Sequence, residues 1–267
     1  AKVLWWVYAL LTFAEAFLLF LGGMDMYEAF CHAFGTMATG GFSTRNASIA
    51  AYNSNYVDWV VIVFMLLAGI NFMIHYNVLF NGKIMVLRND RELRFYLGVI
   101  ATAILIGTGV VWLKGVSDAD TAQRSFRVHR LGEAGMEQKV TDEAGKVGSL
   151  YRAVRHVTFQ VVSLTTTTGY CTADFDVWPG MVRLMLVVLM FFGGCAGSTG
   201  GGIKMVRVMV VLKAAARQLR SQIQPRLVKP VKVGGRALDE KQVSDILGFF
   251  VMFILLFVFF TLIMSFF

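Results

Sequence analysis

The sequence predicts an all-α membrane protein built from repeated units, and three observations support that prediction. Hydrophobic residues make up 57% of the 267 residues and charged residues only 16%, which is unlike a soluble domain. Several apolar stretches reach about 20 residues, the length that a helix needs to cross a bilayer. A short glycine-centred motif occurs twice in matching surroundings, which is typical of an internal repeat.

Five stretches are expected to enter or cross the membrane as helices. They are residues 3–21, 56–80, 95–113, 181–219 with an interruption, and 246–267. Glu15 in the first stretch must face protein or water at that depth. The second stretch is expected as one continuous helix, in which Asn71 and His75 share a face that looks at other helices or a water-filled vestibule.

A repeated order of segments divides the chain into units. Residues 24–38 and 150–165 both read as short helices, each preceded by an apolar segment and followed by a glycine-centred loop and a second apolar segment. Each unit is therefore a membrane helix, a pore helix, a filter loop and a membrane helix. We expect one unit over residues 1–93, a second over 94–240, and the first helix of a further unit over 241–267.

The two loops have the composition of an ion filter. Four consecutive threonines, 165–168, suit neither helix nor strand, because their hydroxyls compete with the backbone for hydrogen bonds. Followed by Gly-Tyr, they approach the TVGYG pattern, in which backbone carbonyls replace the water around K⁺. We expect K⁺, and no transition metal, to be coordinated by the carbonyls of Thr39, Gly40, Gly41, Phe42, Thr167, Thr168, Gly169 and Tyr170.

A glycine-rich run interrupts the fourth apolar stretch. Residues 181–192 would reach about 18 Å as a helix, roughly half of the hydrocarbon core, so the run lies inside the membrane. Such a loop could be a movable barrier, or the glycines could permit a tight crossing of unbroken helices. We expect a gate loop formed by Gly193, Gly194, Gly197, Ser198, Thr199, Gly200, Gly201 and Gly202.

The net charge of +8 sets topology and does not indicate nucleic-acid binding, because the basic residues lie between apolar segments. A basic stretch follows the glycine-rich run and is expected on the cytoplasmic side. It could also dock an acidic protein or anionic lipid. Its members are Lys204, Arg207, Lys213, Arg217, Arg220, Arg226, Lys229, Lys232 and Arg236.

Other chemistries are less well supported by the sequence. Three widely spaced cysteines, Cys31, Cys171 and Cys195, match no zinc, redox or disulfide framework, and no cofactor is expected. An intramembrane enzyme that uses Ser198 or Thr199 with a histidine is one alternative to ion transport. A purely structural membrane subunit is another.

The repeated units, the motifs of residues 39–43 and 167–171, and the run of residues 193–204 together resemble the Trk/Ktr/HKT superfamily of K⁺ transporters. The resemblance implies a multi-pass protein of the bacterial inner membrane that takes up K⁺ by channel or symport. It implies four units around one pseudo-fourfold pore. This chain would supply the second and third units and the first helix of the fourth, as a piece of a longer protein.

The resemblance also implies partners and a gate. The family forms homodimers and binds a cytoplasmic, nucleotide-binding, TrkA-like regulatory subunit, which would dock on the basic inner face. The family's gate is an intramembrane loop that corresponds to residues 193–202. The arginine that closes against this loop belongs to the fourth unit and has no counterpart in this sequence.

Overall fold

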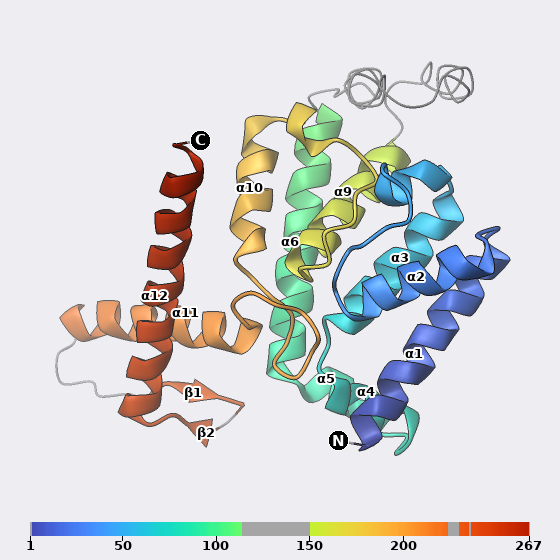
Figure 1. The fold of residues 1–267 in the computed structure, drawn as a ribbon. Helices are drawn as coiled ribbons and strands as arrows, with labels where there is room; N and C mark the ends of the chain where they lie inside the picture. The colour runs from blue at the N-terminus through green and yellow to red at the C-terminus, as the bar shows by residue number, and fades with distance from the viewer. Residues whose placement is uncertain (1, 114–149, 224–229, 235, 267) are drawn as a thin grey trace.

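The computed structural model describes residues 2–113, 150–223, 230–234 and 236–266, and it is almost entirely helical (Figure 1). Arg226 and Lys229 of the basic stretch lie outside the described residues, as does the side chain of Arg236. The predicted all-α membrane fold is confirmed by the order and the apolar character of these helices.

The first unit contains a membrane helix, a pore helix, a short 3₁₀ turn and a helix that bends sharply. Glu15 is fully buried, as its position in an apolar helix requires. Asp25 caps the pore helix, and its carboxylate accepts a hydrogen bond from the Tyr27 amide at 3.1 Å. The elements are α1 (Lys2–Leu21), α2 (Met26–Met37), η1 (Ser48–Tyr52), α3 (Asn55–Ala68), α4 (Phe72–Leu79) and α5 (Met85–Asn89).

The second unit repeats this order and is followed by a small hairpin and a long apolar helix. The pore helix begins and ends where the sequence predicted. The elements are α6 (Arg91–Leu113), α9 (Leu150–Thr165), η2 (Phe175–Val177), α10 (Gly180–Met190), α11 (Met205–Ile223), β1 (Lys232–Val233), β2 (Arg236–Ala237) and α12 (Glu240–Met264). The two strands pair antiparallel.

The predicted continuous helix over residues 56–80 is wrong. The chain breaks between α3 and α4, which meet at 103°. Asn71 caps α4 by accepting a hydrogen bond from the Met73 amide at 2.8 Å, so it does not share a helical face with His75. This cap fixes where α4 starts, because an asparagine side chain competes well for backbone amides at a helix start.

Fewer helices are long enough to cross a membrane than the five expected. Among the described residues, α1, α6 and α12 qualify, and the bent pair α3–α4 would make a fourth. Helix α10 is apolar but short. Helix α11 lies across α12 in Figure 1 and carries the basic residues, so it does not continue the direction of α10.

Corresponding helices of the two units make corresponding contacts. The pore helix α2 packs against α1 and α3, and the pore helix α9 packs against α6 and α10. In addition α9 packs against α3 of the first unit, which joins the two units.

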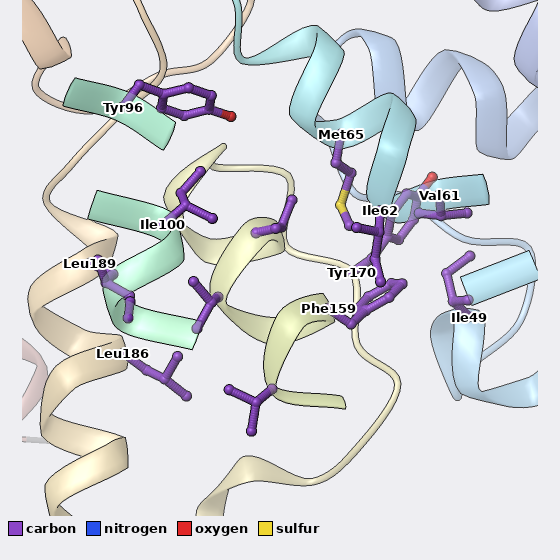
Figure 2. Packing of buried hydrophobic residues seen from close by; sticks show 14 of the residues in the cluster. Ile49, Val61, Ile62, Met65, Tyr96, Ile100, Phe159, Tyr170, Leu186 and Leu189 are labelled. Atoms are coloured by element: carbon purple, nitrogen blue, oxygen red, sulfur yellow. The ribbon is translucent and has the colours of Figure 1, made fainter. Parts of the chain in front are cut away.

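Figure 2 shows the core at this junction. Phe159 of α9 and Tyr170 lie beside the α3 side chains Val61 and Ile62, and all four are essentially inaccessible to solvent. The opposite face of α9 meets buried residues of α6 and α10. The loop that carries Tyr170 is therefore held between the two units.

This packing predicts that Gly35 in α2 cannot accept a side chain. A methyl group there would overlap the Tyr170 hydroxyl oxygen and would lie 3.1 Å from the Phe42 carbonyl oxygen. We expect Gly35→Ala to destabilise the protein by about 1–3 kcal/mol, the usual cost of overpacking. Thermal unfolding in detergent measures the change.

Gly98→Ala in α6 is the matched control, because a methyl group at Gly98 meets no atom within 4 Å. This substitution should leave the unfolding temperature unchanged or raise it, since alanine favours helix. Equal unfolding temperatures for the two variants would contradict the packing described for Tyr170.

Candidate functional site

In each predicted filter loop, two backbone amides donate hydrogen bonds to a single carbonyl near the end of the preceding pore helix. The Gly35 carbonyl accepts hydrogen bonds from the amides of Gly40 and Gly41, at 2.8 and 3.3 Å. Ser163 occupies the equivalent position in the second unit, and its carbonyl accepts from the two equivalent amides at 2.9 and 3.3 Å. The repeat seen in the sequence is therefore also a repeat of backbone hydrogen bonding.

The same backbone conformation occurs in both loops. Gly41 and Gly169 have φ angles of +67° and +89°, which glycine adopts without strain. Thr39 and Thr167 have φ angles of 53° and 61°, which are uncommon for a β-branched residue. Strained backbone of this kind is concentrated at functional sites.

The two loops lie side by side. A Cβ atom at Gly41 would overlap the carbonyl oxygen of Thr168 and would lie 3.3 Å from the carbonyl carbon of Gly169. The Tyr170 hydroxyl donates a hydrogen bond to the Phe42 carbonyl at 3.1 Å. The eight predicted filter residues are thus brought together from positions 128 apart in the chain.

The carbonyls of the loops fall into two sets. In the first set, the Phe42 carbonyl accepts from Tyr170, the Tyr170 carbonyl accepts from the Ser163 hydroxyl at 2.7 Å, and the Gly169 carbonyl accepts from the Cys171 thiol at 4.0 Å. No hydrogen bond among the described residues reaches the carbonyls of a second set, which are Thr39, Gly40, Gly41, Thr167 and Thr168. The second set is free to coordinate a cation.

The glycine-rich run forms a loop that interrupts the helix between α10 and α11. The Gly193 amide donates to the Ile203 carbonyl at 2.8 Å, and the Ile203 amide donates to the Phe191 carbonyl at 3.0 Å. A side chain at Gly193 would overlap the carbonyl of Gly201. The loop is therefore a broken helix whose ends are tied together, and the alternative of an unbroken helix crossing is wrong.

This loop fits into the break between α3 and α4. The Cys195 amide donates to the Gly69 carbonyl at 2.8 Å, and the Phe72 amide donates to the Gly197 carbonyl at 3.1 Å. The Thr199 hydroxyl donates to the carbonyl of the last residue of α3 at 3.2 Å. Each broken helix leaves some amides and carbonyls without a partner inside the helix. These groups form hydrogen bonds with those of the other broken helix.

The loop also touches both filter loops. The Thr39 hydroxyl shares its proton between the Ala38 carbonyl at 2.7 Å and the Thr199 carbonyl at 3.1 Å. The Thr167 hydroxyl accepts from the Gly201 amide at 2.7 Å. The predicted gate residues therefore lie directly against the predicted filter residues.

Two charged side chains, which the sequence did not single out for this site, hold the loop from other sides. One carboxylate oxygen of Glu92 accepts from the amides of Ala196 and Val206, at 2.7 and 3.1 Å. The Lys204 ammonium donates to the Gly200 carbonyl. Glu92 follows a basic link at the start of α6, and nothing in its local pattern indicates a partner 104 residues away.

The geometry does not support the enzyme alternative. The Ser198 hydroxyl donates to the Cys195 carbonyl at 2.6 Å, and the His75 Nε2 atom bonds to the Leu67 carbonyl at 2.8 Å. A nucleophilic serine would need a base to accept its proton, and the Ser198 proton goes to a backbone carbonyl instead. The Lys204 ammonium lies 3.5 Å from the Ser198 hydroxyl oxygen but acts there as a donor. No group of three His, Cys, Asp or Glu side chains able to hold a metal ion occurs in the described part of the chain.

Comparisons with known proteins give relatives over nearly the whole chain. The chain is 34% identical over 258 residues to the Trk system potassium uptake protein TrkH of Escherichia coli (strain K12), covering 97% of this chain and 47% of that protein. It is 31% identical over 265 residues to TrkG of the same strain, covering 99% of this chain and 48% of that protein. The chain thus spans about half the length of the curated relatives it matches.

A solved structure has a similar fold. The crystal structure of the potassium transporter TrkH from Vibrio parahaemolyticus superposes with a TM-score of 0.80 at 33% identity, and the match covers 96% of this chain and 49% of that one. The sequence profile of the TrkH family, described as a cation transport protein, matches residues 1–266. These relatives are transport proteins rather than enzymes, and this chain belongs to the TrkH family.

Proposed function

We propose that this chain forms part of a pathway for K⁺ uptake across a membrane, with the paired loops as its selectivity filter. The observation that carries the proposal is the repeated loop geometry, in which two glycine-centred turns lie side by side with a set of free carbonyls. The names of the relatives support K⁺ as the ion. Carbonyl oxygens can replace the hydration shell of K⁺.

The filter needs more than two loops. Two adjacent loops cannot enclose a pore, and the relatives are about twice as long as this chain. We therefore propose that the units over residues 1–93 and 94–240, and the segment over 241–267, take their places around a pore that further units complete. In this arrangement Thr39, Gly40, Gly41, Thr167 and Thr168 provide the coordinating carbonyls, and Phe42, Gly169 and Tyr170 complete the outer turns.

The loop over residues 193–202 is proposed as the gate. It connects α10 to α11 and lies against the filter threonines Thr39 and Thr167. Its contacts to the α3–α4 break and to the filter threonines are hydrogen bonds between neutral groups, each of which contributes about 0.5–1.5 kcal/mol, and its contacts to Glu92 and Lys204 are charge-assisted and contribute about 1.5–3 kcal/mol each. A modest conformational free energy could therefore displace it.

The proposed setting is a bacterial inner membrane, with a homodimer and a TrkA-like nucleotide-binding subunit on the inner face. Helix α11 supports a docking role because several of its basic side chains are at least partly exposed. Lys213 and Arg217 also join α11 to the hairpin and to the start of α12, through the Lys232 carbonyl at 2.8 Å and the Glu240 carboxylate at 2.5 Å.

Filter function can be tested at Gly41 in the full-length protein. Gly41→Ala places a methyl group against the Thr168 carbonyl at a residue with φ of +67°. We expect K⁺ uptake to fall at least about tenfold, since the combined strain and overlap exceed about 1.4 kcal/mol. Uptake is measured in cells that lack other K⁺ uptake systems.

Gly82→Ala is the matched control for this variant. Gly82 has a similar φ of +62°, and a methyl group there meets no atom within 4 Å. It should retain uptake. A loss of equal size in both variants would mean that backbone strain, and not the contact between the loops, is responsible.

Gate function can be tested by deletion. Removing residues 197–201 takes away the Gly197 and Thr199 contacts to α3–α4 and the Thr199 and Gly201 contacts to the filter loops. We expect K⁺ flux through purified protein in liposomes to rise several-fold. Unchanged flux at normal protein yield would rule out the loop as a barrier.

Glu92 offers a point substitution that loosens the same loop. Glu92→Ala removes the acceptor for the amides of Ala196 and Val206, and we expect flux to rise about three- to tenfold if the closed loop loses one to two hydrogen bonds. Asp90→Ala is the control, because the Asp90 side chain accepts from the Leu93 amide and caps α6 without contacting the loop. If both variants show a similar rise in flux, the rise results from a disturbed start of α6 and not from a loosened loop.

A further inference from the structure

We infer that Thr39 and Thr167 couple the filter to the gate, so that opening the glycine-rich loop changes the inner end of the filter. The inference rests on the proposed function, since it requires both a filter and a gate. It adds a role for two side chains whose backbone carbonyls alone were assigned to the filter.

The contact joins two residues of the loop to two different filter strands. The Thr39 hydroxyl shares its proton between the Ala38 carbonyl at 2.7 Å and the Thr199 carbonyl at 3.1 Å. Thr167 uses its hydroxyl oxygen to accept from the Gly201 amide at 2.7 Å. The two threonines occupy equivalent positions of the two units, and they hold loop residues that are two positions apart. The loop is thus attached to both strands at once.

The backbone conformation of Thr39 and Thr167 links their contact with the loop to the shape of the filter. Both have positive φ angles, 53° and 61°, which cost a β-branched residue free energy. Such a conformation persists when the surrounding structure holds it. The bonds to Thr199 and Gly201 are part of what holds it, so their loss allows both strands to relax at the first carbonyl of each filter.

The coupling works in both directions. If loop opening relaxes the filter and the relaxed filter binds K⁺ more weakly, a filter occupied by K⁺ favours the closed loop by the same free energy. The other hydrogen bonds that anchor the loop go to Glu92, to Lys204 and to the break between α3 and α4, and in the described structure none of them involves Thr39 or Thr167. In the described structure, the threonine pair is therefore the hydrogen-bonded link between the two sites.

The experiment removes each hydroxyl while keeping the shape of the side chain. In the full-length protein in liposomes, Thr39→Val and Thr167→Val should each raise K⁺ flux roughly fivefold, as expected for losing one hydrogen bond of the closed state. Thr39→Ser and Thr167→Ser keep the hydroxyl and should each raise flux clearly less than the valine substitution at the same position. Thr102→Val is the control, because the Thr102 hydroxyl bonds within α6 to the Gly98 carbonyl at 2.8 Å.

The same substitutions are then made in the protein that lacks residues 197–201. If the threonines act through the loop, Thr39→Val and Thr167→Val cause no further change in flux there. If their full effect persists without the loop, or if flux in the intact protein is unchanged, the coupling is wrong. If the deletion itself leaves flux unchanged, the gate proposal fails instead, so the two failures are distinguishable.

A second measurement covers the case in which a valine variant does not fold. Hydrogen–deuterium exchange of the segment 193–204 is measured in Thr167→Ser, which keeps the hydroxyl acceptor for the Gly201 amide, and in Thr167→Ala, which removes it. The Gly201 amide should exchange several-fold faster in Thr167→Ala than in Thr167→Ser. Equal exchange rates would overturn the inference.

Discussion

Backbone that is not helical can exist at membrane depth only if protein groups satisfy its amides and carbonyls, and this constraint organises the structure. Three segments of the chain are of this kind: the two filter loops and the loop between α10 and α11. The Gly35 and Ser163 carbonyls each take two amides of a filter loop. The carbonyls of Thr39, Gly40, Gly41, Thr167 and Thr168 accept no hydrogen bond within the described structure.

The same constraint explains why both second helices are broken at places that meet. The break between α3 and α4 exposes the Gly69 carbonyl and the Phe72 amide, and the loop after α10 supplies the Cys195 amide and the Gly197 carbonyl to them. Neither break would be stable alone in an apolar environment. The two units are thus joined by backbone hydrogen bonds as well as by the apolar core around Phe159.

Side chains complete this network where backbone partners do not suffice. Glu92 takes two amides that flank the start of α11, and Lys204 takes a carbonyl within the loop. Charged groups make stronger hydrogen bonds than neutral ones, so they can hold a segment that has little apolar surface of its own. A loop attached by a few polar contacts, with small residues in between, can move as one piece.

Local patterns in the sequence were sufficient to predict the pore helix over Leu150–Thr165, the position of the glycine-rich break and the matched loops, because spacing, capping and glycine content act over a few residues. They did not predict the bend after Ala68 or the direction of α11, and they gave Glu92 no partner. These features depend on groups that are far apart in the chain, such as the Gly69 carbonyl and the Cys195 amide, which become neighbours only when the units pack together. Packing thus decided where each broken helix finds its hydrogen bonds, because the membrane offers no water to supply them.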